Sequence, residues 1–442
     1  MAKHKREFYI MVKQIKAKQL RRVAIIGGSR IPFCRAYTGY TNETNLSMLS
    51  TALGGLADKY GLRGAKIDEV MAGAVINHSK DFNLAREATL DAGFSPFTPG
   101  TTIQIACGTS LQAALTLGAK IASGEIESGI AAGADSISDS PVVFGKKFAH
   151  RMIKLSRARS FGEKLGVFKG FSFGELTPSA PSVNEPRTKM SMGQHCELMA
   201  REWGITREAQ DKLAYESHKN ASAAIDDGYH DDLIVPCAGI VKDNNVRADS
   251  TLEKMASMKP AFDKKSGFGT LTAANSTPLT DGASTVLLAS EEWAKERGLP
   301  VLAYLTMGSV GANNFGAGDG LLMAPTIAVS DMLKRADLTF DDIDLFEIHE
   351  AFAAQVLCTL KAWNDKSYCK QVLGRDKVMG KIDPKKINVK GSSLAYGHPF
   401  AATGARILAN TAKLLNTENK NRALISVCTA GGMGVAALVE KA

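Results

Sequence analysis

One segment of the sequence places a cysteine where it could act as a nucleophile. Cys107 lies in the segment IQIACGTS and precedes a predicted helix, Ser110–Ser123. A thiol at a helix N-terminus is favoured as thiolate by the helix dipole and by free backbone N–H groups. Gly108 allows another chain or a substrate to approach closely. A small buried thiol is the alternative, since free cysteine is often buried, and this segment alone leaves both interpretations open.

His398 occupies a loop of unusual composition between Gly397 and Pro399. Proline biases the preceding residue toward an extended backbone, which holds the imidazole on a defined loop. A helix, Ala402–Leu415, is predicted to follow. Histidine exchanges protons near neutral pH, so this setting favours an acid or base over a structural side chain.

Cys428 and His349 each follow a predicted strand, Ala423–Cys428 and Ile343–Ile348. A glycine-rich turn follows Cys428, and its N–H groups could face a developing oxyanion. The carboxyl edge of a strand, where His349 lies, is a common ligand site in α/β sheets. Thioester chemistry needs a nucleophilic sulfur, a base, donors for a carbonyl oxygen and a second acid or base for a carbanion, and these four residues cover those roles.

The cysteine pattern indicates free thiols. Their number is odd, no C-x-x-C pair is present, and no signal peptide precedes them, so we predict a reducing, cytoplasmic compartment. No cysteine and histidine set has metal-ligand spacing, and we expect no metal. The seven cysteines are Cys34, Cys107, Cys196, Cys237, Cys358, Cys369 and Cys428.

The chain of 442 residues carries a net charge of +9. Nucleic acid, an anionic membrane surface and a polyphosphate ligand all fit that charge, as does solubility alone. No nucleic-acid-binding motif is visible, so we expect no nucleic-acid partner. No run of about 18 apolar residues predicts a membrane span. Residues 1–20 form a predicted basic tail, either solvated or an anchor to an anionic surface.

Alternating helix and strand patterns predict an α/β fold with a mainly parallel sheet. The strands Arg22–Gly28 and Ser128–Ala134 belong to this pattern, and a strand is also expected at Ile387–Val389. The order around Cys107 repeats around His398, which predicts two similar halves with both loops over a shared cleft. We assign the N-terminal half to residues 21–138 plus 272–290. The C-terminal half is 291–442, and 139–271 is an inserted lid.

Over residues 21–442 these segments together resemble the thiolase family, closest to the 3-ketoacyl-CoA thiolase type found as the β-subunit of fatty-acid oxidation complexes. The motif GHPFAATGAR, the segment HEAFAAQ and the turn CTAGGMG are specific when found in one chain. The resemblance implies a layered α-β-α-β-α core of two similar halves with an inserted lid. The other matching segments are SRIPF at 29–33, Met192-Gly193 with Glu197, residues 207–218 and NSTPLTDG at 275–282.

The resemblance also implies a role for each cysteine and for His398. Cys107 matches the residue that carries the acyl group. His398 matches the base that activates this sulfur, and Cys428 the residue that moves a proton at the α-carbon of acetyl-CoA. Backbone N–H groups of Cys107 and Ala430 would form an oxyanion hole, although Ala430 replaces a frequent glycine.

Ser276 and Thr277 fall where the family contacts coenzyme A, although Thr277-Pro278 replaces Ser-Gly. Many thiolases have asparagine, which holds a water, where this chain has His349. His349 therefore either serves that role or donates directly to the substrate oxygen.

The activity implied is cleavage of 3-ketoacyl-CoA by CoA, with CoA as co-substrate and no permanently bound cofactor. The alternatives are a biosynthetic acetyl-CoA acetyltransferase, a decarboxylating ketoacyl synthase and a non-catalytic acyl-CoA or lipid carrier. A homodimer or dimer of dimers is implied, and a hydratase/dehydrogenase partner subunit fits the same type. Basic residues of the lid could bind CoA phosphates, a partner subunit or a membrane surface, or simply be solvated; they are Lys146, Lys147, Arg151, Lys154, Arg157, Arg159, Lys164 and Lys169.

Overall fold

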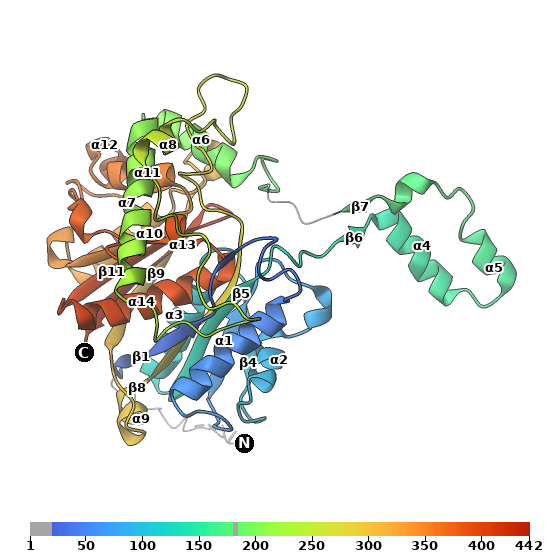
Figure 1. Ribbon diagram of the computed structural model, residues 1–442, viewed down its shortest axis with the longest axis horizontal. Coiled ribbons are helices and arrows are strands. Elements are labelled where there is room, and N and C mark those ends of the chain that lie inside the picture. Colours follow the sequence, from blue (N-terminus) through green and yellow to red (C-terminus); the bar gives the residue numbers. More distant parts are fainter. Residues whose placement is uncertain (1–19, 180–183) are drawn as a thin grey trace, which may run out of the picture.

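The computed structural model describes residues 20–179 and 184–442, so nearly all of the predicted basic tail lies outside it. Two sets of strands form the centre of the molecule (Figure 1). The N-terminal set has the order β4-β3-β5-β8-β1, and the short β2 pairs with β8. Its strands are β1 (Val23–Arg30), β2 (Cys34–Arg35), β3 (Glu69–Gly73), β4 (Gly100–Thr102), β5 (Ser128–Asp135) and β8 (Thr280–Ser290).

The C-terminal set continues the same sheet in the order β10-β11-β12-β9. The two sets join where β1 pairs briefly with β9, through Ala24 with Tyr304 and Ile25 with Ala303. The strands of the C-terminal set are β9 (Ala303–Ala312), β10 (Leu345–Ile348), β11 (Arg422–Thr429) and β12 (Met433–Lys441).

The prediction of a mainly parallel sheet is wrong. Among the strands of residues 20–179 and 184–442, only β3 with β4, β3 with β5, and β10 with β11 pair in parallel. The strand β8 runs antiparallel to both β1 and β5, and β12 runs antiparallel to β11 and β9. A tight turn at 430–432 joins β11 directly to β12, and strands joined so closely must be antiparallel because a parallel pair needs a long crossover.

Two helices fill the space between the strand sets: α3 (Thr109–Ser123) and α14 (Thr403–Thr417). One apolar cluster contains residues of both helices and of both strand sets. A Cβ on Gly404 of α14 would lie 2.4 Å from the backbone nitrogen of Leu111, so the helices meet where only glycine fits.

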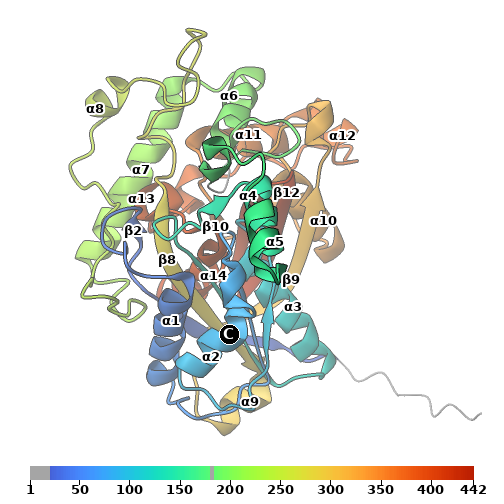
Figure 2. The ribbon, with the colours of Figure 1, turned by 90° about the vertical axis from the view of Figure 1, so that its right-hand side faces the viewer.

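The outer faces of the strands are covered by further helices. The helices α1 (Asn45–Lys59) and α2 (Leu84–Asp91) pack on the N-terminal set, and α10 (Pro325–Ala336) and α11 (Ala353–Trp363) cover the C-terminal set (Figures 1 and 2). The predicted layered α-β-α-β-α arrangement is confirmed. Short helices at the periphery are α9 (Glu291–Glu296) and α12 (Lys366–Gln371).

The prediction of a strand at Ile387–Val389 is wrong. Ile387 forms one isolated bridge with Phe346, and Asn388 has a φ of 47° that ends the extended run. The side chain of Asn388 instead bonds both backbone groups of Ile348, at 2.8 Å each. This side chain replaces a strand ladder at the end of β10.

The segment predicted as one lid has two parts that differ in packing. The helices α6 (Met192–Glu202), α7 (Arg207–Asp226) and α8 (Leu252–Ala256) lie against the body, where α6 and α7 contact α11. An arm, residues 143–179, projects away from the body in Figure 1, and in Figure 2 it points toward the viewer, so that α4 and α5 lie in front of the body. It contains β6 (Val143–Phe144), α4 (Lys146–Arg157), α5 (Phe161–Gly166) and β7 (Pro178–Ser179). No helix among the described residues is long and apolar enough to cross a membrane.

Candidate active site

Cys107 sits at a tight bend between β4 and α3. Ala106, directly before it, has a φ of 45°, a strained conformation for a residue with a Cβ and one that clusters at functional sites. A Cβ on Gly108 would lie 2.7 Å from Val435 and 2.8 Å from Thr429, so the bend lies directly against the β11–β12 hairpin. Cys107 as a residue is partly exposed, whereas the other six cysteines are buried.

His398 is held from below by the first turn of α14. Its Nδ1 lies 2.5 Å from Thr403 Oγ1, and its backbone bridges to Leu279. The preceding Gly397 has a φ of 97°, and a Cβ there would meet Thr280 at 2.5 Å, which explains the glycine. Ser110 of α3 accepts a hydrogen bond from the Ala405 N–H at 2.8 Å, so the Cys107 and His398 loops are tied together.

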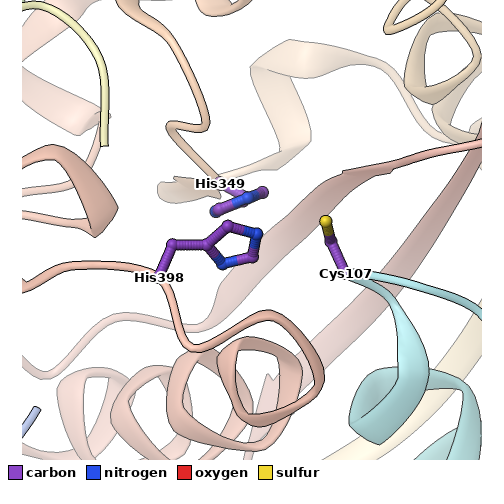
Figure 3. A group of neighbouring side chains, drawn as sticks. All are labelled: Cys107, His349 and His398. Atoms are coloured by element: carbon purple, nitrogen blue, oxygen red, sulfur yellow. The ribbon is translucent and has the colours of Figure 1, made fainter. Parts of the chain in front are cut away.

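His349 completes a compact group with Cys107 and His398. Its imidazole centroid lies 4.1 Å from that of His398, and its Nδ1 lies 2.8 Å from Ser393 Oγ. One ligand atom of each of the three residues lies within 4.8 Å of the others (Figure 3). Both Nε2 atoms are buried and have no hydrogen-bond partner in the described part of the chain. Attack of a thiol on a carbonyl group requires a base for the thiol proton and a hydrogen-bond donor for the oxygen. The two unpartnered nitrogens could supply these two functions.

Burial sets the charge state of the three side chains. It lowers the pKa of His398 to about 3, and the nearby Arg406 charge acts in the same direction. Burial also lowers the pKa of His349, with smaller contributions from His398 and Arg406. The pKa of Cys107 is raised to about 12 by burial, opposed mainly by a hydrogen bond from the Ala430 backbone N–H. Without substrate the site therefore holds a neutral thiol and two neutral imidazoles.

Cys428 lies near the end of β11 and is buried. Burial, and then the neighbouring Cys107, raises its pKa well above the ordinary value. Such a thiol stays protonated at neutral pH and can donate a proton to a carbanion. The turn after it contains Ala430, and Gly431 and Gly432 adopt φ values of 81° and 70°. The backbone N–H groups of Ala430 and Cys107 both act on the Cys107 sulfur.

Ser276 and Thr277 lie beside the loop that carries His349. Ser276 bridges to Phe352, and its buried hydroxyl has no partner within the described ranges. The Thr277 hydroxyl donates to the Ala351 carbonyl at 3.2 Å. The hydroxyl of Ser276 is therefore available to a ligand, while Thr277 already uses its proton.

The sulfur and the two imidazoles form a set that could hold a metal ion of the kind zinc sites use. The three residues come from different loops, so no sequence spacing could have revealed the set. The absence of a metal cofactor stays a prediction.

Three polar residues of the site escaped the sequence analysis: Thr403, Ser393 and Arg406. Thr403 and Ser393 contact the Nδ1 atoms of His398 and His349, and Arg406 donates to Ser393 at 2.9 Å. All three lie in the segment 389–406, in which only His398 was predicted to be functional. Only the three-dimensional contacts separate them from their neighbours in that motif.

The arm carries the eight basic residues for which the sequence left open CoA phosphates, a partner subunit, a membrane surface or simple solvation. Several of them line a hollow of about 740 Å³ between α4 and α5. Arg151 is already engaged, because Glu175 pairs with it at 2.6 Å and the carbonyls of Val167 and Gly170 accept from it. The remaining lining residues with basic side chains are Lys147, His150, Lys154, Arg157 and Lys169.

The chain is similar to thiolases along almost its whole length. Residues 23–292 match the thiolase N-terminal domain, and residues 300–441 match the thiolase C-terminal domain. A 3-ketoacyl-CoA thiolase of Photobacterium profundum is 41% identical over 97% of this chain and 99% of its own length. One of Shewanella baltica is 40% identical over 97% and 98%.

Solved structures agree with this similarity. Bacillus anthracis acetyl-CoA acetyltransferase superposes with a TM-score of 0.81 at 31% identity, covering 96% of this chain and all of its own. Human mitochondrial 3-ketoacyl-CoA thiolase in complex with CoA gives a TM-score of 0.79 at 27% identity, covering 96% and 99%. The fold and these similarities define an acyltransferase. The chain belongs to the thiolase family, and the predicted family and fold are confirmed.

Proposed function

We propose that the protein is a degradative 3-ketoacyl-CoA thiolase, which cleaves 3-ketoacyl-CoA with CoA to give acetyl-CoA and a shortened acyl-CoA. The observation that carries the proposal is the convergence of Cys107, His349 and His398, from three separate loops, onto one group within 4.8 Å with both Nε2 atoms unpartnered. The similarity to 3-ketoacyl-CoA thiolases supports the substrate class.

In the first half-reaction the Cys107 sulfur attacks the 3-keto carbon, and its proton passes to His398 Nε2. Both groups start neutral, because at neutral pH the thiol does not lose its proton to water and the imidazole does not gain one. Transfer of the proton from one to the other therefore generates the nucleophilic thiolate. The bond between C2 and C3 then breaks, and its electron pair forms the enolate of acetyl-CoA. Cys428 donates its proton to C2, and acetyl-CoA leaves.

In the second half-reaction a CoA thiol gives its proton to the Cys428 thiolate. The CoA sulfur attacks the carbonyl carbon of acyl-Cys107, and the Cys107 sulfur departs and recovers its proton from His398. The backbone N–H groups of Cys107 and Ala430 stabilise one oxyanion. His349 belongs to the same group and serves the other oxygen together with protonated His398.

Mass spectrometry of the intact protein after mixing with 3-ketoacyl-CoA tests the proposal. We expect one acyl group on the wild-type chain and none on Cys107→Ala. Cys34→Ala is the matched control, because Cys34 is buried in the outer core and should leave acylation unchanged. An acyl group that persists on Cys107→Ala would remove the nucleophile from its role. Release of CO2 from a malonyl thioester would instead favour a ketoacyl synthase.

The finer predictions about assembly join this proposal. We infer a homodimer or a dimer of dimers in a reducing cytoplasm, with CoA bound next to Ser276. The arm provides the surface that would contact a hydratase/dehydrogenase partner or a membrane. It exposes Phe161 and Phe173 beside its basic residues. Sedimentation of the full chain with and without the arm, alone and with anionic vesicles, separates these contacts.

A further inference from the structure

The two histidines of the site differ in what contacts their inner nitrogens. The Nδ1 of His398 faces Thr403, whose hydroxyl can accept from an Nδ1–H at 2.5 Å. With Nδ1 as the donor, the Nε2 of His398 is left as a base for Cys107; the threonine hydroxyl can also donate, so this contact by itself does not select the tautomer of His398. His349 faces Ser393 at 2.8 Å, and this serine has a second partner. The second partner distinguishes the two imidazoles.

Arg406 is the second partner, and it restricts the serine. Its Nη2 lies 2.9 Å from Ser393 Oγ in a buried setting. A guanidinium can only donate, so Ser393 must accept this hydrogen bond. The serine keeps one proton, and among the described residues His349 Nδ1 is the acceptor that the structure gives for it. A buried hydroxyl proton without an acceptor costs free energy, so the serine donates to Nδ1.

A neutral imidazole that accepts at Nδ1 carries its proton on Nε2. His349 is neutral because it is buried and lies near both His398 and Arg406. Its Nε2 is buried without a partner in the described part of the chain, and its ring belongs to the group around Cys107. We propose that Arg406 and Ser393 are positioning residues which, through one hydrogen-bonded relay, fix His349 as the Nε2–H tautomer and so make it a hydrogen-bond donor to the thioester oxygen.

The proposal rests on the proposed function, since a donor is useful only if an oxygen develops negative charge there. It also explains how two imidazoles 4.1 Å apart can perform opposite tasks. His398 presents a lone pair to the Cys107 proton, whereas His349 presents a proton to the substrate. Burial lowers the pKa of Arg406, and the nearby Glu347 and Glu350 oppose that shift.

Nitrogen-15 NMR of histidine-labelled protein without substrate tests the tautomer directly. The spectrum of His349→Asn identifies the His349 signals by their loss. We expect Nε2 to carry the proton in the wild type and in Ser393→Thr, which keeps the hydroxyl, and a mixture of tautomers in Ser393→Ala. A proton on Nδ1 in the wild type would overturn the relay. This measurement needs no turnover, so it stands even if Cys107 fails to accept an acyl group.

A double-mutant cycle separates positioning from mere packing. We expect Ser393→Ala to lower the kcat of thiolysis about ten-fold or more, with the KM for 3-ketoacyl-CoA nearly unchanged. In the His349→Asn background the same substitution should change kcat less than about two-fold, because the group that it positions is gone. An equal loss in both backgrounds would show that Ser393 acts through the fold and would overturn the proposal. If Ser393→Ala fails to fold, the tautomer of His349 in the wild-type protein still tests the proposal.

Discussion

The catalytic group and the arm carry reactive or charged side chains in opposite kinds of setting. Cys107, His349 and His398 are fixed by neighbouring loops that leave almost no free volume, as the glycines at 108 and 404 show. The arm at 143–179 contains no buried residue in α4 or α5 and leaves large apolar side chains in water. Chemistry requires positions held within fractions of an ångström. A contact surface requires accessible side chains instead.

The largest expected effect concerns Cys428 in the β11–β12 hairpin. It tests whether this hairpin takes part in catalysis or only supports the Cys107 loop. Cys428→Ala should lower the rate of thiolysis about 10³-fold, because no acid then protonates the carbanion. Acyl transfer from a simple acyl-CoA to Cys107 should continue, since it needs no proton at carbon. Steady-state thiolysis and intact mass measure the two steps separately. Equal loss of both would mean that Cys428 supports the Cys107 loop.

Removing one partner of an ion pair should lower the stability of the body much more than that of the arm. Arg30 and Asp243 form a two-point pair at 2.7 Å, with side chains 4% and 1% exposed. Asp243→Ala leaves a buried charge unpaired and should lower the free energy of unfolding by about 3–5 kcal/mol. Glu175→Ala removes the partner of Arg151 in the arm and should leave the urea midpoint unchanged. Similar shifts for both variants would contradict the comparison.

The low pKa of His398 should make stability depend on pH. Its folded pKa of about 3 lies below the ordinary 6.5, so the unfolded chain binds the proton first as the pH falls. The contribution of His398 is therefore complete above pH 6.5 and is lost toward pH 3. At pH 5 the loss is about 2 kcal/mol.

Urea unfolding of the wild type and of His398→Asn between pH 7 and 5 measures this effect. The variant has no imidazole at 398, so its stability relative to the wild type should rise by about 2 kcal/mol over that range. Taking the difference cancels the titration of the other buried groups. A constant difference would show that His398 is already accessible to protons in the folded state.

The smallest expected effect belongs to the arm. Phe161 and Phe173 are 77% and 83% exposed, so replacing both with serine removes little packing. The free energy of unfolding should change by less than about 0.5 kcal/mol, and acylation of Cys107 should be unchanged. Thermal unfolding and intact mass provide the two measurements. A large loss of activity would mean that the arm contributes to the site.

Local sequence sufficed for many of the elements. The helix predicted at Ser110–Ser123 is α3, and the strand predicted at Ser128–Ala134 is β5, because apolar periodicity and flanking glycines act over a few residues. The same reasoning failed at Ile387–Val389. There a side chain, Asn388, replaced a ladder that apolar residues alone would suggest. Strand direction also escaped prediction, since pairing depends on residues far apart in the chain.

The sequence by itself determined the chemical inventory: two cysteines and two histidines in segments rich in glycine or proline, within the motifs of one family. Only the tertiary structure decided how they meet and which protons they carry. Their separation is set by the packing of α3 against α14, and their neutral state by the exclusion of water. The relay from Arg406 through Ser393 to His349 depends on the same packing, because hydrogen-bond direction follows from contacts that residue order does not contain.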